Sequence, residues 1–160
     1  MSRYPGTFAL IEPMLRGRKV LDLGCNSGYH LKTAGSESLG LDFDENLLRQ
    51  AQSQNPSVFF ARANFNETFF PVQDENFEIV LASHVLEHVH NPIKFLAECN
   101  RILCENGIII LGLPVEDGIY AKLFLNYFGH EGHIYSFSPA NISKLLDICG
   151  FGDIKYIYII

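Results

Sequence analysis

The residues that most clearly suggest ligand chemistry form the run VLDLGCNSGY at positions 20–29. A strand-like apolar stretch leads into a glycine-bearing turn and then a helix start, with an acid, Asp22, before the first glycine. Glycines let the backbone approach a ligand closely, and a helix N-terminus offers unpaired amides. A dinucleotide fingerprint needs G-x-G-x-x-G to seat a pyrophosphate. The glycine-like positions here are 24, 26 and 28, so the spacing disfavours a pyrophosphate.

Polar residues also end the next two strand-like runs. Asp42 ends the run 37–42, where a carboxylate in nucleotide-binding folds accepts hydrogen bonds from the two ribose hydroxyls. Asp44 fits the N-cap of the following helix instead. The alternative is that both acids only shape a turn. Asn64 follows the run 57–63, and its carbonyl oxygen can accept a hydrogen bond.

Histidines are the candidate general bases, because neutral imidazole can take up a proton at about pH 7. His84 follows the run 77–83, and His133 lies in a segment rich in aromatics. A capping or packing role is the alternative for each. The residues 130–133, HEGH, lack the H-E-x-x-H spacing of a zinc site, and we expect no metal. Cys25 is expected to be a small apolar turn residue rather than a nucleophile.

These segments together resemble the class I S-adenosylmethionine-dependent methyltransferases, in particular the methyltransferase type 11 group. Residues 20–29 resemble the family's motif I, an acid followed by G-x-G-x-G, from which Asn26 departs. Asn enters the left-handed region more easily than other non-glycine residues, so the turn can survive. Residues 77–89, FEIVLASHVLEHV, resemble the fourth strand and the L-E-H-V segment, and residues 133–151 resemble the C-terminal portion. The likeness spans roughly residues 18 to 158.

The resemblance implies S-adenosyl-L-methionine as the cofactor. It implies that Asp42 holds the ribose, that Phe43 lies beside the adenine, and that Asn64 accepts from the adenine amino group. Position 83 opens toward the methyl donor in that family. The expected cofactor-binding residues are Asp22, Gly24, Cys25, Asn26, Gly28, Tyr29, Asp42, Phe43, Asn64, Phe65 and Ser83, and the catalytic candidates are His84 and His133.

Short strand-like runs alternate with helical patterns along the chain, which predicts an α/β fold with a parallel sheet. The expected strands are Lys19–Gly24, Glu37–Asp42, Ser57–Ala63, Phe77–Ser83, Gly107–Leu113 and Asp153–Ile160, and the expected helices are Glu45–Ser53, Pro92–Cys104 and 139–149. The resemblance implies a Rossmann-like three-layer sandwich with strand order 3-2-1-4-5 and onward.

No residues remain for that fold's last antiparallel strand. We therefore expect Asp153–Ile160 to pair directly with Gly107–Leu113 in a monomer, the alternative being a homodimer formed near this edge. Residues 1–160 are expected to form one domain, in which the aromatic-rich segment 114–137 is a lid over the acceptor pocket.

The composition limits which binding partners and which cellular compartment we expect. The net charge of −6 and the scattered basic residues argue against nucleic acid. The four cysteines form no C-x-x-C pair, and neither a signal peptide nor a membrane span is apparent, so we expect a cytoplasmic protein. The expected function is methyl transfer to a small molecule, through an O, N, C or S atom that the sequence does not identify. Two alternatives stay open: a cofactor-binding, non-catalytic partner subunit, and a nucleotide-dependent oxidoreductase.

Overall fold

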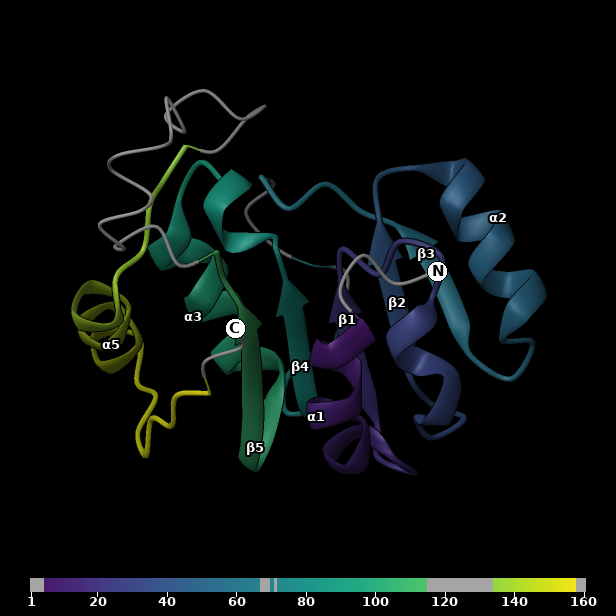
Figure 1. Ribbon diagram of the computed structural model, residues 1–160, viewed down its shortest axis with the longest axis horizontal. Coiled ribbons are helices and arrows are strands. Elements are labelled where there is room, and N and C mark those ends of the chain that lie inside the picture. The colour runs from purple at the N-terminus through teal and green to yellow at the C-terminus, as the bar shows by residue number, and fades with distance from the viewer. Residues whose placement is uncertain (1–4, 67–69, 71, 115–133, 158–160) are drawn as a thin grey trace.

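The chain folds around a parallel β-sheet, as the alternating pattern predicts. The structure, a computed structural model, describes residues 5–66, 70, 72–114 and 134–157. Within them the sheet has five strands in the order β3-β2-β1-β4-β5, and each neighbouring pair is parallel (Figure 1). The strands are β1 (Val20–Leu23), β2 (Leu39–Asp42), β3 (Phe59–Arg62), β4 (Phe77–Ser83) and β5 (Leu103–Gly112). The predicted order 3-2-1-4-5 is therefore confirmed.

Helices connect the strands, and polar side chains cap the N-termini of three of them. The helical elements are α1 (Pro5–Leu15), η1 (Tyr29–Thr33), α2 (Glu45–Gln54), η2 (Leu86–His88), α3 (Pro92–Ile102) and α5 (Pro139–Ile148), where η marks a 3₁₀ helix. The Asp44 carboxylate accepts from the backbone N–H groups of Asn46 and Leu47 at the start of α2. Asn91 and Ser138 cap α3 and α5 in the same way. Such caps satisfy amides that have no intrahelical partner.

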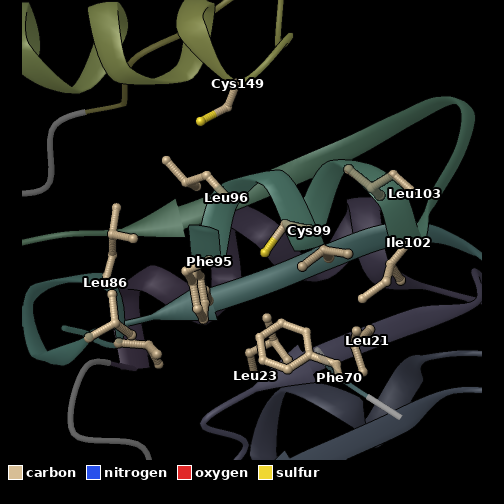
Figure 2. Packing of buried hydrophobic residues seen from close by; sticks show 14 of the residues in the cluster. Leu21, Leu23, Phe70, Leu86, Phe95, Leu96, Cys99, Ile102, Leu103 and Cys149 are labelled. Carbon is tan, nitrogen blue, oxygen red and sulfur yellow. The ribbon is translucent and has the colours of Figure 1, made fainter. Parts of the chain in front are cut away.

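Alternate residues of each central strand pack on opposite faces of the sheet. Leu21 and Leu23 of β1 join a large apolar cluster with α3 and α5. Figure 2 shows Phe95 and Cys99 of α3 in this cluster, with Leu96 lying toward Cys149 beyond the end of α5. Val20 joins a second cluster with α1, η1 and two residues of β4, Ile79 and Leu81. The sheet is thus covered on both faces, which a parallel sheet requires.

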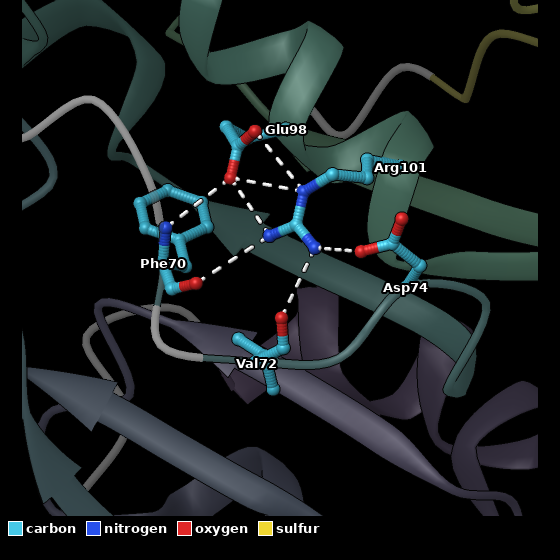
Figure 3. A network of polar contacts seen from close by, with 5 residues as sticks. All are labelled: Phe70, Val72, Asp74, Glu98 and Arg101. Carbon is cyan, nitrogen blue, oxygen red and sulfur yellow. Dashed lines mark hydrogen bonds and ion pairs between the residues drawn. The ribbon is translucent and has the colours of Figure 1, made fainter.

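One polar network secures the segment that leads into β4. The Arg101 guanidinium of α3 donates to the Glu98 carboxylate, 2.8 Å from Nη2 to Oε2, and to the backbone carbonyl of Val72 at 3.1 Å. It also contacts the carboxylate of Asp74, and the N–H of Phe70 donates to Glu98 at 3.2 Å (Figure 3). These contacts tie the chain before β4 to a helix on one face of the sheet.

The structure differs from the expected elements in several places. Asp153–Ile160 forms no strand within its described part, up to residue 157, so no sixth strand pairs with β5 there. Helix α3 ends at Ile102 rather than Cys104, and β5 begins at Leu103 rather than Gly107, with an irregular register between Phe77 and Ile79 of β4. Helix α1 was not expected. The helix expected after the glycine turn is present as the short 3₁₀ helix η1.

The segment expected to act as a lid, 114–137, lies mostly outside the described residues, so the lid stays a prediction. No helix in the described ranges has the length and apolarity needed to span a bilayer.

Candidate cofactor site

The sheet brings three of the predicted site residues to one edge. Leu23 of β1 pairs with Leu41 of β2 on one side and with Ala82 of β4 on the other. The next residue on each of these parallel strands is Gly24, Asp42 or Ser83. They therefore lie side by side at the carboxyl ends of the strands, which is where open α/β sheets bind their ligands.

The turn after β1 has the backbone that its unusual sequence predicts. Gly24 and Gly28 both have φ of 73°, and Asn26 between them has φ of 50°. The left-handed conformation predicted for Asn26 is thus confirmed. Gly24 is required for a second reason, because a Cβ there would lie 2.6 Å from Cγ2 of Val85.

The amides of this turn are all hydrogen-bonded within the protein. Those of Gly24 and Cys25 donate to the carbonyl of Leu41, at 2.8 and 3.0 Å, and that of Gly28 donates to the carbonyl of Cys25 at 2.9 Å. Asn26 donates to Asp42, and Ser27 donates to the side chain of Asn26. These bonds engage the amides of residues 24–28, which precede the first residue of η1, Tyr29. A turn with this pattern is poorly suited to a pyrophosphate, which is held by free N–H groups.

Asp42 and Asp44 have separate structural roles. Asp42 is 5% exposed; its Oδ2 accepts from the N–H of Asn26 at 2.8 Å and its Oδ1 from the N–H of Asp44 at 3.0 Å. Each carboxylate oxygen has a second lone pair for a ligand hydroxyl. Asp44 caps α2, as predicted. Phe43 between them is 71% exposed, an unusual position for a large aromatic side chain.

Asn64 and Phe65 lie beyond the end of β3. Asn64 is exposed, and its Oδ1 accepts from the N–H of Asn66 at 3.1 Å, which is the contact of an ordinary turn residue. Phe65 is half-buried and packs edge-on against Phe70 and Phe95. It therefore belongs at least partly to the core.

Asp22 is fully buried on the sheet face that carries α1 and η1. Its Oδ2 lies 3.6 Å from Nδ1 of His30, which is an ion-pair distance rather than a hydrogen bond. Burial raises the pKa of Asp22, and His30 offsets part of that rise. Burial also acts to lower the pKa of His30, but contact with Asp22 outweighs it, so the pKa of His30 is raised. Tyr29, the residue before His30, packs edge-on against Phe8 of α1.

Cys25 behaves as the small apolar residue that was expected. Its side chain is 2% exposed, and burial, followed by the charges of Asp22 and Asp42, raises its thiol pKa. A thiol must ionise to act as a nucleophile, so this environment argues against such a role.

The fourth strand ends in a turn that holds His84 at the same edge. Ser83 packs against Gly112 of β5, where a Cβ would lie 2.8 Å from Ser83 Oγ. His84 has φ of 56°, and its N–H donates to the carbonyl of Gly112 at 2.8 Å. Its Nδ1 lies 3.3 Å from Oε1 of Glu87, a carboxylate to which sequence reasoning assigned no role. The i, i+3 spacing of these two residues is the signal that could have identified it.

The other histidines contribute less to the described site. His133 lies outside the described residues, so its predicted role is untested. His88 is exposed and ends the 3₁₀ helix η2. Within the described ranges, no group of three or more His, Cys, Asp or Glu residues is arranged to hold a metal ion.

Comparison with known proteins agrees with this geometry. The methyltransferase domain family model matches residues 21–111. A probable S-adenosylmethionine-dependent methyltransferase from Mycolicibacterium smegmatis is 28% identical over 93% of this chain and 58% of its own length. A tRNA U34 carboxymethyltransferase from Idiomarina loihiensis is 31% identical (89% and 48%), and a ubiquinone biosynthesis O-methyltransferase from Methylococcus capsulatus is 32% identical (64% and 46%). The chain thus spans about half the length of these relatives.

Solved structures share the fold. An S-adenosylmethionine-dependent methyltransferase from Thermotoga maritima superposes with a TM-score of 0.76 at 19% identity, covering 94% of this chain and 72% of its own. A Haloferax volcanii methyltransferase, solved in complex with a methyltransferase activator, gives 0.72 at 20% identity, covering 91% and 73%. Together with the family match and the strand order, these likenesses show that the chain belongs to the methyltransferase domain family, whose class I members use S-adenosyl-L-methionine.

Proposed function

We propose that this domain binds S-adenosylmethionine across the carboxyl ends of β1, β2 and β4 and transfers its methyl group to a small-molecule acceptor. The observation that carries the proposal is the alignment of Gly24, Asp42 and Ser83 on three mutually paired strands. Gly24 begins a turn whose backbone a ligand can approach closely, Asp42 is a buried hydrogen-bond acceptor for hydroxyls, and Ser83 leads into the turn that carries His84. All three lie at one edge of the sheet.

The described residues fit this cofactor better than a dinucleotide. The Asp42 carboxylate is directed into the turn and retains lone pairs for two ribose hydroxyls. Phe43 offers an exposed aromatic face beside it for the adenine ring. The amides of residues 24–28 are already engaged, which disfavours phosphate groups and hence a nucleotide-dependent oxidoreductase. The acidic balance of the chain is compatible with a cofactor that carries a cationic sulfonium.

When bound, the cofactor supplies a methyl group that its sulfonium charge has already activated. The chain therefore needs mainly to align the acceptor with that methyl group. Gly24 and Gly28 let the backbone approach closely, while Asp42 orients the ribose. His84 can take up the acceptor's proton if the acceptor must lose one. His133 remains a second candidate for this role.

A small-molecule acceptor is favoured by charge. The chain carries 12 Lys and Arg against 18 Asp and Glu, and a polyanion is usually bound by clustered basic residues. The ubiquinone biosynthesis relative supports an acceptor of this class, whereas the tRNA U34 relative supports RNA. We place the reaction in the cytoplasm because all four cysteines are free thiols.

Two measurements test the proposal. Calorimetry with S-adenosylmethionine, S-adenosylhomocysteine and NAD should show binding of the first two only. Release of S-adenosylhomocysteine should then be followed with a panel of phenols, carboxylic acids, amines and thiols, and with total tRNA. Turnover with tRNA and with none of the small molecules would show that the acceptor is RNA. Cofactor binding without turnover on any acceptor would favour a non-catalytic partner subunit, and failure to bind both S-adenosylmethionine and S-adenosylhomocysteine would refute the proposal.

A further inference from the structure

We propose that Glu87 is a positioning residue, which holds the His84 imidazole by Nδ1 so that Nε2 is the atom that receives the acceptor's proton. The inference rests on the proposed function, because it concerns a proton released during methyl transfer at this edge. It depends on three observations about the turn from His84 to Glu87.

The first observation is the burial of Glu87. Its side chain is 0% exposed, and neither carboxylate oxygen has a hydrogen bond among the described residues. Glutamate is rarely buried to this extent without a partner, because removing a carboxylate from water is strongly unfavourable. The charged contact that the structure gives it is Nδ1 of His84, 3.3 Å from Oε1. A purely structural position would be better filled by an apolar residue of similar size.

The second observation is the backbone of His84. Its φ of 56° is left-handed, a conformation that non-glycine residues seldom adopt. The hydrogen bond from its N–H to Gly112, at 2.8 Å, holds the turn in this form. A residue kept in an unfavourable conformation at the end of a central strand often has a functional role. Here the conformation places a titratable ring directly after Ser83.

The third observation is that the His84 side chain is only partly buried although its Nδ1 faces a buried carboxylate. The ring meets a fully buried carboxylate on its Nδ1 side, yet the His84 side chain is 37% exposed. A carboxylate facing Nδ1 favours the neutral tautomer with its proton on that nitrogen, and in this tautomer Nε2 is the atom that carries the basic lone pair. The present contact is not aligned as a hydrogen bond, and such bonds often tighten only when substrates are bound.

The chemical step balances without any further reactant. The acceptor atom forms its bond to the methyl carbon, the carbon–sulfur bond breaks with its electron pair going to sulfur, and the acceptor's proton passes to Nε2 of His84. Glu87 keeps its own charge throughout and stabilises the imidazolium that results.

The test is the tautomer of His84, measured from the ring nitrogen chemical shifts of ¹⁵N-labelled protein and assigned with His84→Asn. The spectra are recorded at the alkaline end of a pH series, where the ring nitrogen shifts no longer change with pH. We expect the Nδ1-protonated tautomer in the wild type. Glu87→Gln should retain it, because the amide oxygen can still accept, whereas Glu87→Leu should change it to the Nε2-protonated form. An Nε2-protonated wild type would overturn the proposal, even if neither variant folds.

A matched control and a second readout separate positioning from general stability. Glu98→Gln alters another buried glutamate, one that pairs with Arg101, and should leave the His84 tautomer unchanged. A general base contributes roughly 10²–10⁴-fold, so Glu87→Leu should lower kcat by at least about tenfold on whichever panel compound the wild type methylates. Its affinity for S-adenosylmethionine should be unchanged. An unchanged kcat in Glu87→Leu would overturn the proposed role of Glu87. A wild-type protein that does not bind S-adenosylmethionine would instead refute the proposed function.

Discussion

Oδ2 of Asp42 lies 2.8 Å from the backbone nitrogen of Asn26, so the acid that ends β2 holds the turn that follows β1. Asn26 has a left-handed backbone, and this hydrogen bond helps to keep it there. The residue proposed to bind the ribose therefore also orders the turn that must approach the cofactor. Loss of the carboxylate should affect both.

The first prediction separates Asp42 from its neighbour Asp44. Asp42→Ala should weaken binding of S-adenosylmethionine by about tenfold or more, since a hydrogen bond to a charged group contributes roughly 1.5–3 kcal/mol. Asp44→Ala is the matched control: it removes a helix cap and should lower the free energy of unfolding by about 0.5–2 kcal/mol while leaving cofactor affinity unchanged. Calorimetry and urea denaturation measure the two effects. Equal losses of affinity in both variants would contradict the assignment.

How much of the site could be predicted depends on how local its determinants are. The turn at Gly24, Asn26 and Gly28 was predictable, because a left-handed backbone restricts the residue type at each position. Asp42 and Asp44 could be told apart because a strand end and a helix cap have different local patterns. The apolar spacing of α1, with Phe8, Ile11 and Leu15, is a local signal of the same kind.

Features that depend on distant parts of the chain could not be predicted in this way. The apolar alternation after Asp153 is typical of a strand, but a strand also needs a partner, and its described part has none. The burial of Glu87 and the pairing of Asp22 with His30 depend on how η1 and η2 fold back over the sheet. Sequence spacing alone does not determine such burial.

The second prediction compares two glycines with nearly the same backbone. Gly28 has φ of 73°, and a Cβ there would lie 2.8 Å from Nδ2 of Asn55; Gly17 has φ of 69° but nothing within 4 Å. Gly17→Ala should destabilise the fold by about 1–2 kcal/mol through the left-handed backbone alone. Gly28→Ala should cost more, because the clash adds to the same strain. A Cβ at position 28 would also lie 3.0 Å from Cβ of Ala51 and from Cζ of Phe60. Denaturant unfolding measures both variants, and an equal loss would show that these neighbours give way together.

The third prediction concerns the Arg101 network (Figure 3). Arg101→Met keeps the apolar part of the side chain but leaves the largely buried Glu98 without its cation, so we expect a loss of about 1–3 kcal/mol. The further change Glu98→Gln removes the unpaired charge, and the double variant should be more stable than Arg101→Met alone. A double-mutant cycle in urea measures the coupling. Strictly additive losses would mean that the two side chains act independently.

The last prediction follows from the ion pair of His30 with Asp22 beneath the turn. The pKa of His30 is raised in the folded protein, so the stabilisation is fully present below the unfolded value of about 6.5 and is lost as the pH rises through the folded value. The burial-raised pKa of Asp22 changes stability in the same direction.

His30→Gln should therefore be destabilising at about pH 6 and much less so at about pH 8.5, relative to the wild type. His90→Gln, at an exposed histidine, is the matched control and should show no such change between the two conditions. Urea unfolding of all three proteins at both pH values measures the difference, and a His30→Gln effect that stays constant or grows with pH would show that the pair does not stabilise the fold through the charge on His30.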